Sequence, residues 1–229
     1  MLSRRAANTI RGLLDNWLPT AVREARPFAW AVSWWLGPKA LVDFKYRAFR
    51  MSPQEFSAAY EVLDGGRYSE RGSDTTPAQA DWILANIPPP PLKLLEIGPG
   101  KGALTSRLRA AGHDVWVIDI HPPQADQQYL QGTVDSIPLP GKSVDVVVLA
   151  HVIEHVPSLT KAFLELERVA RRSVLIVTPR QRFFRWTFDY HLHFFYSLDH
   201  LASHTHRGKT TGAEIDGDLC LIWDVSESM

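Results

Sequence analysis

Three glycines alternate with other residues in the segment Glu96–Ala103, which runs EIGPGKGA. Glycine adopts positive φ angles and lets a ligand lie against the backbone, and a helix that starts behind such a loop offers unpaired N–H groups. A tight turn without a ligand does not require three alternating glycines. We therefore expect Gly98, Gly100 and Gly102 to form a cofactor-binding loop. The spacing alone leaves the cofactor open, because Gly98, Gly100 and Ala103 also satisfy the dinucleotide pattern G-x-G-x-x-G/A.

Two carboxylates are expected near this loop. Glu96 precedes the first glycine by two residues, where it can hold an ammonium group or order the loop. Asp119 ends the next apolar run, and a carboxylate at such a strand end is placed to accept hydrogen bonds from both hydroxyls of a ribose. The plainer interpretation of Asp119 is a solvated carboxylate at the end of a strand.

Several histidines follow two later apolar runs. His151, Glu154 and His155 come after one run, and His191 and His193 alternate with aromatic residues after the next. Parallel strands bring their carboxyl ends to one sheet edge, where ligands of open α/β folds bind, so His151, His191 and His193 are candidate catalytic residues. His151 is the preferred general base because imidazole titrates near neutral pH. Alternatively, the phenylalanines beside the later pair belong to the core and one of those two histidines is solvated.

The elements that must position these residues begin after four consecutive prolines, residues 88–91. Short Val/Ile/Leu runs alternate there with amphipathic segments, which is typical of a parallel sheet covered on both faces. The predicted strands are Leu92–Ile97, Asp114–Ile120, Leu130–Val134, Val144–Leu149 and Ser173–Val177, followed by a hairpin of Thr211–Ile215 and Leu219–Val225. The predicted helices are Ala103–Ala111, Ser158–Arg171, with Phe163, Leu164 and Leu166 facing the core, and a short helix capped by Ser197.

The segment before the prolines is expected to be helical. Ser52–Glu55 is a capping box that starts a helix ending before Gly65, and Thr76–Pro77 starts another. We therefore divide the chain into an N-terminal helical cap, residues 1–87, and a cofactor-binding domain, residues 88–229. The predicted fold class is α/β, with a Rossmann-like, doubly wound, mainly parallel seven-stranded sheet that ends in an antiparallel hairpin.

Residues 1–50 combine basic and aromatic side chains. They carry nine Arg or Lys against three Asp or Glu, and four of the eight tryptophans, in a chain whose 25 basic and 25 acidic residues balance. Three interpretations compete: a lid over an acceptor pocket, a peripheral membrane contact, and a nucleic-acid contact. We favour the lid, keep the membrane contact second, and do not expect nucleic-acid binding.

The composition excludes other classes. With 229 residues, 45% apolar and 22% charged, the chain has an ordinary globular composition. The single Cys220 excludes an internal disulfide and a multi-cysteine zinc site. No apolar run approaches the length of a transmembrane helix, and no secretory signal is recognisable. We expect a cytoplasmic protein, with membrane association as the alternative, and make no prediction of the oligomeric state.

The motifs between about residues 92 and 180 resemble the class I S-adenosylmethionine (SAM)-dependent methyltransferases, specifically the type 11 group. That family has E/D-x-G-x-G-x-G, an acidic second strand, a G-D-A loop and a later E-H-V, matched here by Glu96–Gly102, Asp119, Gly132–Val134 and Glu154–Val156. The resemblance implies that SAM is the cofactor. It implies that the cofactor-binding residues are Glu96, Gly98, Gly100, Gly102, Asp119, Ile120, Thr133 and Val134. The family's aspartate in G-D-A is replaced by Thr133, so the contact with adenine is left to the Val134 backbone N–H. Asp135 is an alternative to the missing aspartate, but we expect it to be a solvated loop acid.

The segment His151–His155 also looks like the E-x-x-E-H of metal-dependent O-methyltransferases. In that resemblance His151, Glu154 and His155 would bind a divalent metal, with His191 or His193 as a later ligand. We favour the metal-free alternative, because E-H-V also occurs in family members that need no metal and spacing alone does not establish a ligand set.

The sequence therefore predicts a SAM-dependent methyltransferase that acts on a small-molecule or lipid-like acceptor, most readily at oxygen. The second hypothesis is a non-catalytic SAM-fold module that binds a partner or a membrane surface through its N-terminal helices. An NAD-dependent oxidoreductase ranks third, and binding of labelled SAM would separate it from the first two.

Overall fold

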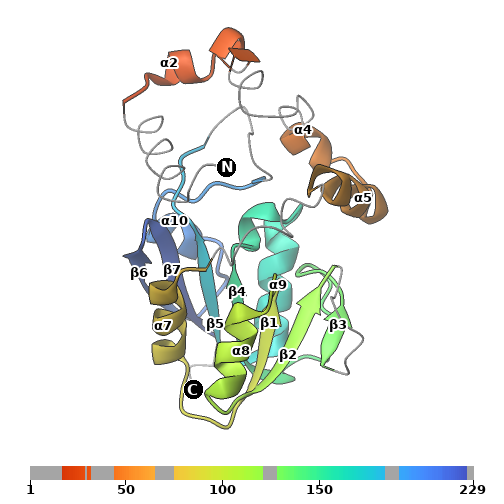
Figure 1. Cartoon of the computed structure of the whole chain (residues 1–229), viewed down its shortest axis with the longest axis vertical. Coiled ribbons are helices and arrows are strands. Elements are labelled where there is room, and N and C mark those ends of the chain that lie inside the picture. Colours follow the sequence, from red (N-terminus) through yellow and green to blue (C-terminus); the bar gives the residue numbers. More distant parts are fainter. Residues whose placement is uncertain are drawn as a thin grey trace.

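The strands form one seven-stranded sheet in the order β3-β2-β1-β4-β5-β7-β6, which lies in the lower half of Figure 1. The structure is a computed structural model and describes residues 17–28, 30–31, 44–64, 75–120, 128–183 and 191–225. The strands are β1 Lys93–Ile97, β2 Asp114–Asp119, β3 Tyr129–Gln131, β4 Val144–Ala150, β5 Ala170–Pro179, β6 Lys209–Ile215 and β7 Asp218–Asp224. The first five strands pair in parallel, and β7 pairs antiparallel with both β5 and β6. The predicted fold class is confirmed.

Several of the helices begin at residues whose side chains accept from the first N–H groups. Ser52 and Glu55 form the reciprocal capping box expected for α5, and Thr76 and Gln79 form one for α7. Ser197 caps the last short helix through the N–H of His200, as expected. The helices are α2 Thr20–Arg23, α4 Phe44–Ala48, α5 Pro53–Asp64, α7 Pro77–Asn86, α8 Ala103–Ala110, α9 Leu159–Val169 and α10 Leu198–Ala202, with a 3-10 turn, η2, at Ile153–His155.

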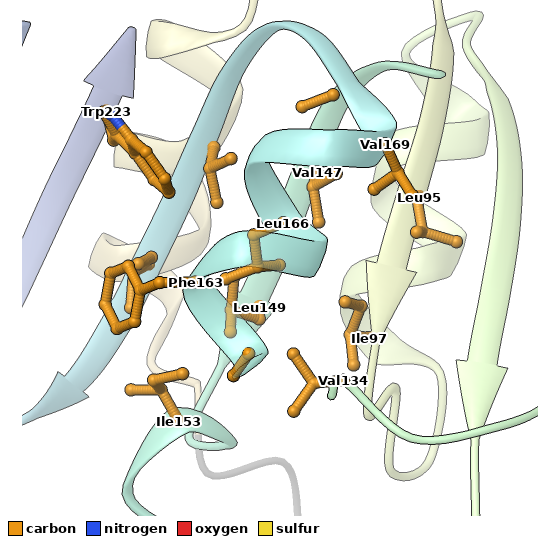
Figure 2. Close-up of a cluster of buried hydrophobic side chains, with 14 of the residues drawn as sticks. Leu95, Ile97, Val134, Val147, Leu149, Ile153, Phe163, Leu166, Val169 and Trp223 are labelled. Carbon is orange, nitrogen blue, oxygen red and sulfur yellow. The ribbon is translucent and has the colours of Figure 1, made fainter. Parts of the chain in front are cut away.

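Both faces of the sheet are covered, because successive residues of the central strands point to opposite sides. Helix α9 packs on one face, where Phe163 and Leu166 lie over Val147 and Leu149 of β4 (Figure 2). Helices α7 and α8 cover the other face through Ile83, Leu104 and Leu108, together with the strand residues that alternate with those of the first face. Because these strands are parallel, the carboxyl ends of β1, β2, β4 and β5 lie at one edge of the sheet, between the two helix layers.

Three details differ from the sequence predictions. Strand β3 is Tyr129–Gln131 rather than residues 130–134, because Thr133 pairs with Ser136 in a local turn. Helix α9 ends at Val169 and β5 begins at once, so residues 170–171 are strand rather than helix. Leu164 is 50% exposed and does not face the core, since it lies opposite the stripe formed by its apolar neighbours on α9.

The expected N-terminal cap lies partly outside the described residues, which exclude residues 1–16, 29, 32–43 and 65–74. Helices α4 and α5 contact each other and Leu192 through Phe44, Ala48 and Phe56. Helix α7 instead packs on the sheet, although the predicted division assigns it to the cap. The division at residues 87/88 stays a prediction. In the described part of the chain, no helix is both long and apolar enough to cross a membrane.

Candidate active site

The glycine loop connects β1 to α8 and has the backbone that the sequence predicts. Gly98, Gly100 and Gly102 all adopt positive φ, at 67°, 53° and 75°. Gly98 donates its N–H to the carbonyl of Ile118 over 2.8 Å, which fixes the loop against β2. A Cβ added to Gly100 would meet no heavy atom within 4 Å, so the space above the loop is open at that point. A ligand can therefore lie directly on this backbone.

Glu96 lies beneath the loop and is almost completely buried, with 3% of its surface exposed. Its Oε2 accepts a hydrogen bond of 2.5 Å from the hydroxyl of Thr105 on α8. Burial raises the pKa of Glu96 to about 7, against the smaller opposing effects of Thr105 and the charge of Arg109. A buried carboxyl with this pKa gains from a cationic partner, which fits the ammonium of an amino acid.

Asp119 ends β2 on the same edge as the loop and is half-buried, as is Ile120 after it. The carbonyl of Asp119 accepts a hydrogen bond from Gly132 over 3.0 Å, which ties the following loop to the strand. In that loop the side chain of Val134 is buried in the core, whereas Thr133 is half-buried. The sequence motifs thus meet at the carboxyl ends of β1 and β2.

Val152 connects this region to the histidine-bearing loop after β4. A Cβ on Gly98 would lie 2.6 Å from Cγ2 of Val152, so the valine side chain rests on the bare glycine backbone. The preceding residue, His151, adopts a φ of 59° and donates its N–H to the carbonyl of Val177 over 2.8 Å. Such a backbone conformation is unfavourable for a residue with a Cβ and is found preferentially at functional sites.

The ring of His151 lies between two buried carboxylates. Its Nδ1 is 3.6 Å from Oε1 of Glu154, and its Nε2 is 3.5 Å from Oδ2 of Asp218 at the start of β7. Asp218 is held in turn by a hydrogen bond of 2.8 Å from Nε2 of Gln79 on α7. Both ring contacts exceed the usual length of a hydrogen bond, so they are electrostatic contacts that orient the ring.

Glu154 anchors the segments around the histidines and is 1% exposed. Its Oε2 accepts a hydrogen bond of 3.1 Å from Thr178, and its carbonyl accepts hydrogen bonds from the N–H groups of Leu192 and His193 over 2.7 and 3.1 Å. Burial acts to raise the pKa of Glu154, but the adjacent ring of His151 and the charges of the nearby imidazoles together lower it to about 2. The carboxyl is therefore ionised at neutral pH.

A group with the chemistry of metal ligands is formed by Glu154, His155 and His191, whose ligand atoms lie within 4.8 Å of one another. The rings of His155 and His191 meet edge to face at 4.9 Å, and Nδ1 of His191 lies 2.8 Å from the amide oxygen of Gln181. This group keeps Glu154, His155 and the later ligand His191 of the set considered in the sequence, but it does not include His151.

The later histidines line the same region, and neither is solvated. His191 is buried and His193 is half-buried, so neither is fully solvated as the alternative interpretation supposed, whereas Phe194 and Phe195 are buried as that interpretation has it. Burial lowers the pKa of His193 to about 4, against the smaller opposing effect of its hydrogen bond of 2.9 Å to the carbonyl of Val156. His193 is therefore neutral at pH 7.

A cavity of about 410 Å³ opens beside His193, between α4 and the residues after β5. Lys45, Leu192, His193 and His200 line it together with aromatic rings. The aromatic residues are Tyr46, Phe49, Phe183, Phe194 and Tyr196. Sequence reasoning missed this cavity, and it also missed Asp218, Gln79 and Thr178. No motif marks these three residues, because they lie on elements remote in sequence and meet only through the order of the strands.

The residues at the carboxyl edge define a class of protein. An acid-preceded glycine loop after β1, an acidic end of β2 and a final antiparallel hairpin are the fold of class I SAM-dependent methyltransferases. Residues 95–178 match the family described as "Methyltransferase domain". Residues 95–178 thus match a methyltransferase domain, which agrees with the resemblance seen in the sequence, and SAM is the cofactor of that class.

Curated proteins with similar sequences are named methyltransferases. An uncharacterized methyltransferase of Mycobacterium tuberculosis is 36% identical over 111 residues, 44% of this chain and 44% of that protein. A malonyl-[acyl-carrier protein] O-methyltransferase of Serratia marcescens is 30% identical over 93 residues, 37% of this chain and 36% of that protein. The chain thus spans less than half the length of these relatives.

Solved structures support the fold. A SAM-dependent methyltransferase from Aquifex aeolicus superposes with a TM-score of 0.52 at 16% identity, over 70% of this chain and 97% of that chain. A Pyrococcus horikoshii protein gives a TM-score of 0.51 at 11% identity, over 66% of this chain and 93% of that chain. At these identities the likeness concerns the architecture alone.

Proposed function

We propose that the chain is a SAM-dependent methyltransferase that transfers a methyl group to an oxygen atom of a small-molecule or lipid-like acceptor. The observation that carries this proposal is the contact of Val152 with Gly98. It brings the residue that follows His151, a proton acceptor, against the loop assigned to the cofactor. Methyl transfer to a hydroxyl needs both partners in line and a group that accepts the hydroxyl proton.

On the cofactor side, SAM supplies a methyl group bound to a sulfonium. Glu96, Gly98 and Gly100 bind its amino-acid end in this proposal, and Asp119 accepts the hydrogen bonds of its ribose. The open backbone at Gly100 and the buried carboxyl of Glu96 support the assignment. The full set assigned to the cofactor is Glu96, Gly98, Gly100, Gly102, Asp119, Ile120, Thr133 and Val134.

On the acceptor side, His151 removes the proton from the acceptor hydroxyl. Glu154 and Asp218 orient its ring and stabilise the imidazolium that forms, since each places a carboxylate oxygen within 3.6 Å of a ring nitrogen. His191 and His193 complete the acceptor side, and no metal takes part in this scheme. Exclusion of water by the packed loop residues strengthens these electrostatic contacts.

A non-catalytic SAM-binding module is the second candidate, and the exposed tryptophans of the N-terminal segment favour it. Trp17 is 81% exposed and Trp30 is 67% exposed, which suits a contact with a partner or a membrane. Sedimentation of the full chain with anionic vesicles tests the membrane contact. Tight binding of SAM without transfer to any fraction of a cell extract would favour the module.

The experiment that tests the proposed function is incubation of the full chain with methyl-labelled SAM and separated metabolite and lipid fractions. We expect label in a small-molecule or lipid fraction, released by alkaline conditions if the methyl group was transferred to a carboxyl oxygen. Label in no fraction, with SAM bound, would contradict catalysis.

A further inference from the structure

Four exposed aromatic side chains surround the cavity of about 410 Å³ between α4 and the residues after β5. They are Tyr46, Phe49, Phe183 and Tyr196, each between 47% and 57% exposed, and we call this part of the molecule the α4 surface. Gathered exposed apolar side chains mark interaction surfaces in proteins. We propose that the α4 surface binds a lipid bilayer that carries anionic headgroups.

The charge of the α4 surface is complementary to such headgroups. Arg47 and Arg50 flank two of the aromatic residues in sequence, Arg182 precedes a third, and all three arginines are exposed. Among the described residues that adjoin the cavity lining in sequence, Asp199 is the one exposed acid. Each Lys or Arg near an anionic membrane contributes about 1 kcal/mol, which corresponds to about fivefold in affinity.

The aromatic side chains suit the boundary between headgroups and acyl chains. Phe49 and Phe183 have no polar side-chain atom, so they gain free energy when lipid replaces water around their exposed rings. A tyrosine has an apolar ring and a hydroxyl that stays in contact with water, which is why tyrosine is enriched at membrane interfaces. Leu192 and Phe194 also line the cavity between these rings, so it offers an apolar surface to acyl chains.

A single-stranded nucleic acid is the other class of partner that basic and aromatic side chains bind, and it fits this surface less well. Its bases stack on the open faces of aromatic rings. Nζ of Lys45 lies 4.1 Å from the centroid of Phe183, and the ring of Tyr196 stacks on that of His200 at 4.4 Å. Both rings thus already use one face within the chain, whereas insertion among lipids needs only that the rings are exposed.

The α4 surface is connected to the loop that follows β4. Leu192 packs with Phe44 of α4, and its N–H donates to the carbonyl of Glu154 in η2 over 2.7 Å. Helix α4 lies above the sheet in the view of Figure 1. A chain bound through the α4 surface therefore has its histidine-bearing loop on the side of the bilayer. In combination with the proposed function, on which this consequence rests, the acceptor is a molecule that resides in the membrane.

The test is sedimentation of the full chain with two kinds of vesicle, one of phosphatidylcholine alone and one with about one quarter phosphatidylglycerol. We expect binding to the anionic vesicles to be at least about tenfold tighter than to the neutral ones, and to weaken as salt is added. Equal binding to both vesicles, or no binding to the anionic ones, would overturn the inference. Binding of a uridine oligonucleotide in place of the vesicles would overturn it as well, and would assign the surface to nucleic acid.

Two variants with matched controls assign the binding to the α4 surface. Arg50→Glu should weaken binding to anionic vesicles at least about fivefold, whereas Lys209→Glu, the same change of charge at an exposed residue of β6, should leave it within about twofold. Phe49→Ser should weaken it about fivefold, whereas Leu164→Ser on α9 should not, although both side chains are 50% exposed. Thermal unfolding shows that each variant is folded. Unchanged binding in both Arg50→Glu and Phe49→Ser would contradict the assignment.

SAM binding, measured separately by calorimetry, distinguishes two failures. A chain that binds SAM but no anionic vesicles contradicts the role of the α4 surface and leaves the proposed function standing. A chain that binds anionic vesicles through Arg50 and Phe49 but does not bind SAM contradicts the proposed function instead.

Discussion

Nε2 of His151 lies 3.5 Å from Oδ2 of Asp218, so the loop after β4 is coupled to the last strand of the sheet. Gln79 extends this coupling to α7, because its Nε2 donates to the same carboxylate oxygen over 2.8 Å. The histidine that we assign as general base is therefore positioned by two elements that are far apart in the sequence, α7 and β7. This arrangement requires the antiparallel hairpin that closes the sheet.

We predict that His151→Ala lowers methyl transfer by about 10²–10⁴-fold, the usual contribution of a positioned general base. The affinity for SAM should change less than twofold, because His151 belongs to the acceptor side. Transfer is measured as label incorporation at saturating SAM, and affinity by calorimetry. His206→Ala, at an exposed histidine, is the control. Full transfer in His151→Ala would move the search for the base to His191 and His193.

The glycine loop predicts a contrast between two substitutions. Gly98→Ala places a Cβ 2.6 Å from Cγ2 of Val152 at a φ of 67°, so we expect it to destabilise the fold by about 1–3 kcal/mol. It should also separate the cofactor loop from the histidine loop and weaken SAM binding. Gly100→Ala also places a side chain on a backbone with positive φ, but the added Cβ meets no other atom. Its loss of stability should therefore stay near 1 kcal/mol. Equal loss of stability in denaturant unfolding would contradict the contact.

Much of the fold follows from sequence pattern alone. Continuous Val/Ile/Leu runs at β1, β4 and β5 indicate buried parallel strands, and the capping boxes at Ser52 and Thr76 mark helix starts, because both signals are local. Leu164 shows where the local signal fails. An apolar residue next to Phe163 suggests a core position, but only the angular spacing along α9 decides which side chain reaches the sheet.

The candidate site, too, could be predicted from the sequence only in part. The glycine loop, Asp119 and the histidines lie in motifs whose spacing is visible in the sequence. Asp218 and Gln79 carry no motif, and their contacts with the His151 loop depend on β7 lying next to β5 and on α7 folding back over the sheet. The group of Glu154, His155 and His191 likewise depends on a contact between distant segments, the hydrogen bond from the N–H of Leu192 to the carbonyl of Glu154.

The burial of Glu96 predicts a pH dependence of stability. Its pKa is about 7 in the folded chain and 4.5 in a solvated reference, so between these values the folded state binds more protons than the unfolded state. The free energy of unfolding contributed by this group therefore falls as the pH rises from 4.5 to 7, by about 3 kcal/mol in total. Glu96→Gln keeps a partner for Thr105 and removes this loss.

The corresponding measurement is urea unfolding of the wild type and Glu96→Gln between pH 5 and pH 8. We expect the variant to gain stability relative to the wild type as the pH rises. Parallel stability curves would show that the carboxyl titrates as it does in solvent, and would contradict its burial.

Chelation separates the two schemes for the acceptor side. We predict that transfer survives dialysis against EDTA and does not rise with added Zn²⁺ or Mn²⁺, since in our scheme His151 acts without a metal. The alternative ligand group is Glu154, His155 and His191, and imidazole with carboxylate suits these ions better than Mg²⁺. Loss of transfer on chelation, restored by Zn²⁺ or Mn²⁺ in the wild type but not in His191→Ala, would contradict the metal-free scheme.

The central claim is that SAM binds at the carboxyl ends of β1 and β2, with Asp119 holding its ribose. Calorimetric titration of SAM into the wild type and Asp119→Ala tests it most directly, with Asp135→Ala, a loop acid outside the assigned set, as the control. Loss of a charged acceptor that leaves its donors unpaired costs about 1–3 kcal/mol, so we predict affinity about 5- to 150-fold weaker in Asp119→Ala and unchanged in Asp135→Ala. Equal affinity of the wild type and Asp119→Ala for SAM, or no binding by the wild type, would contradict the account.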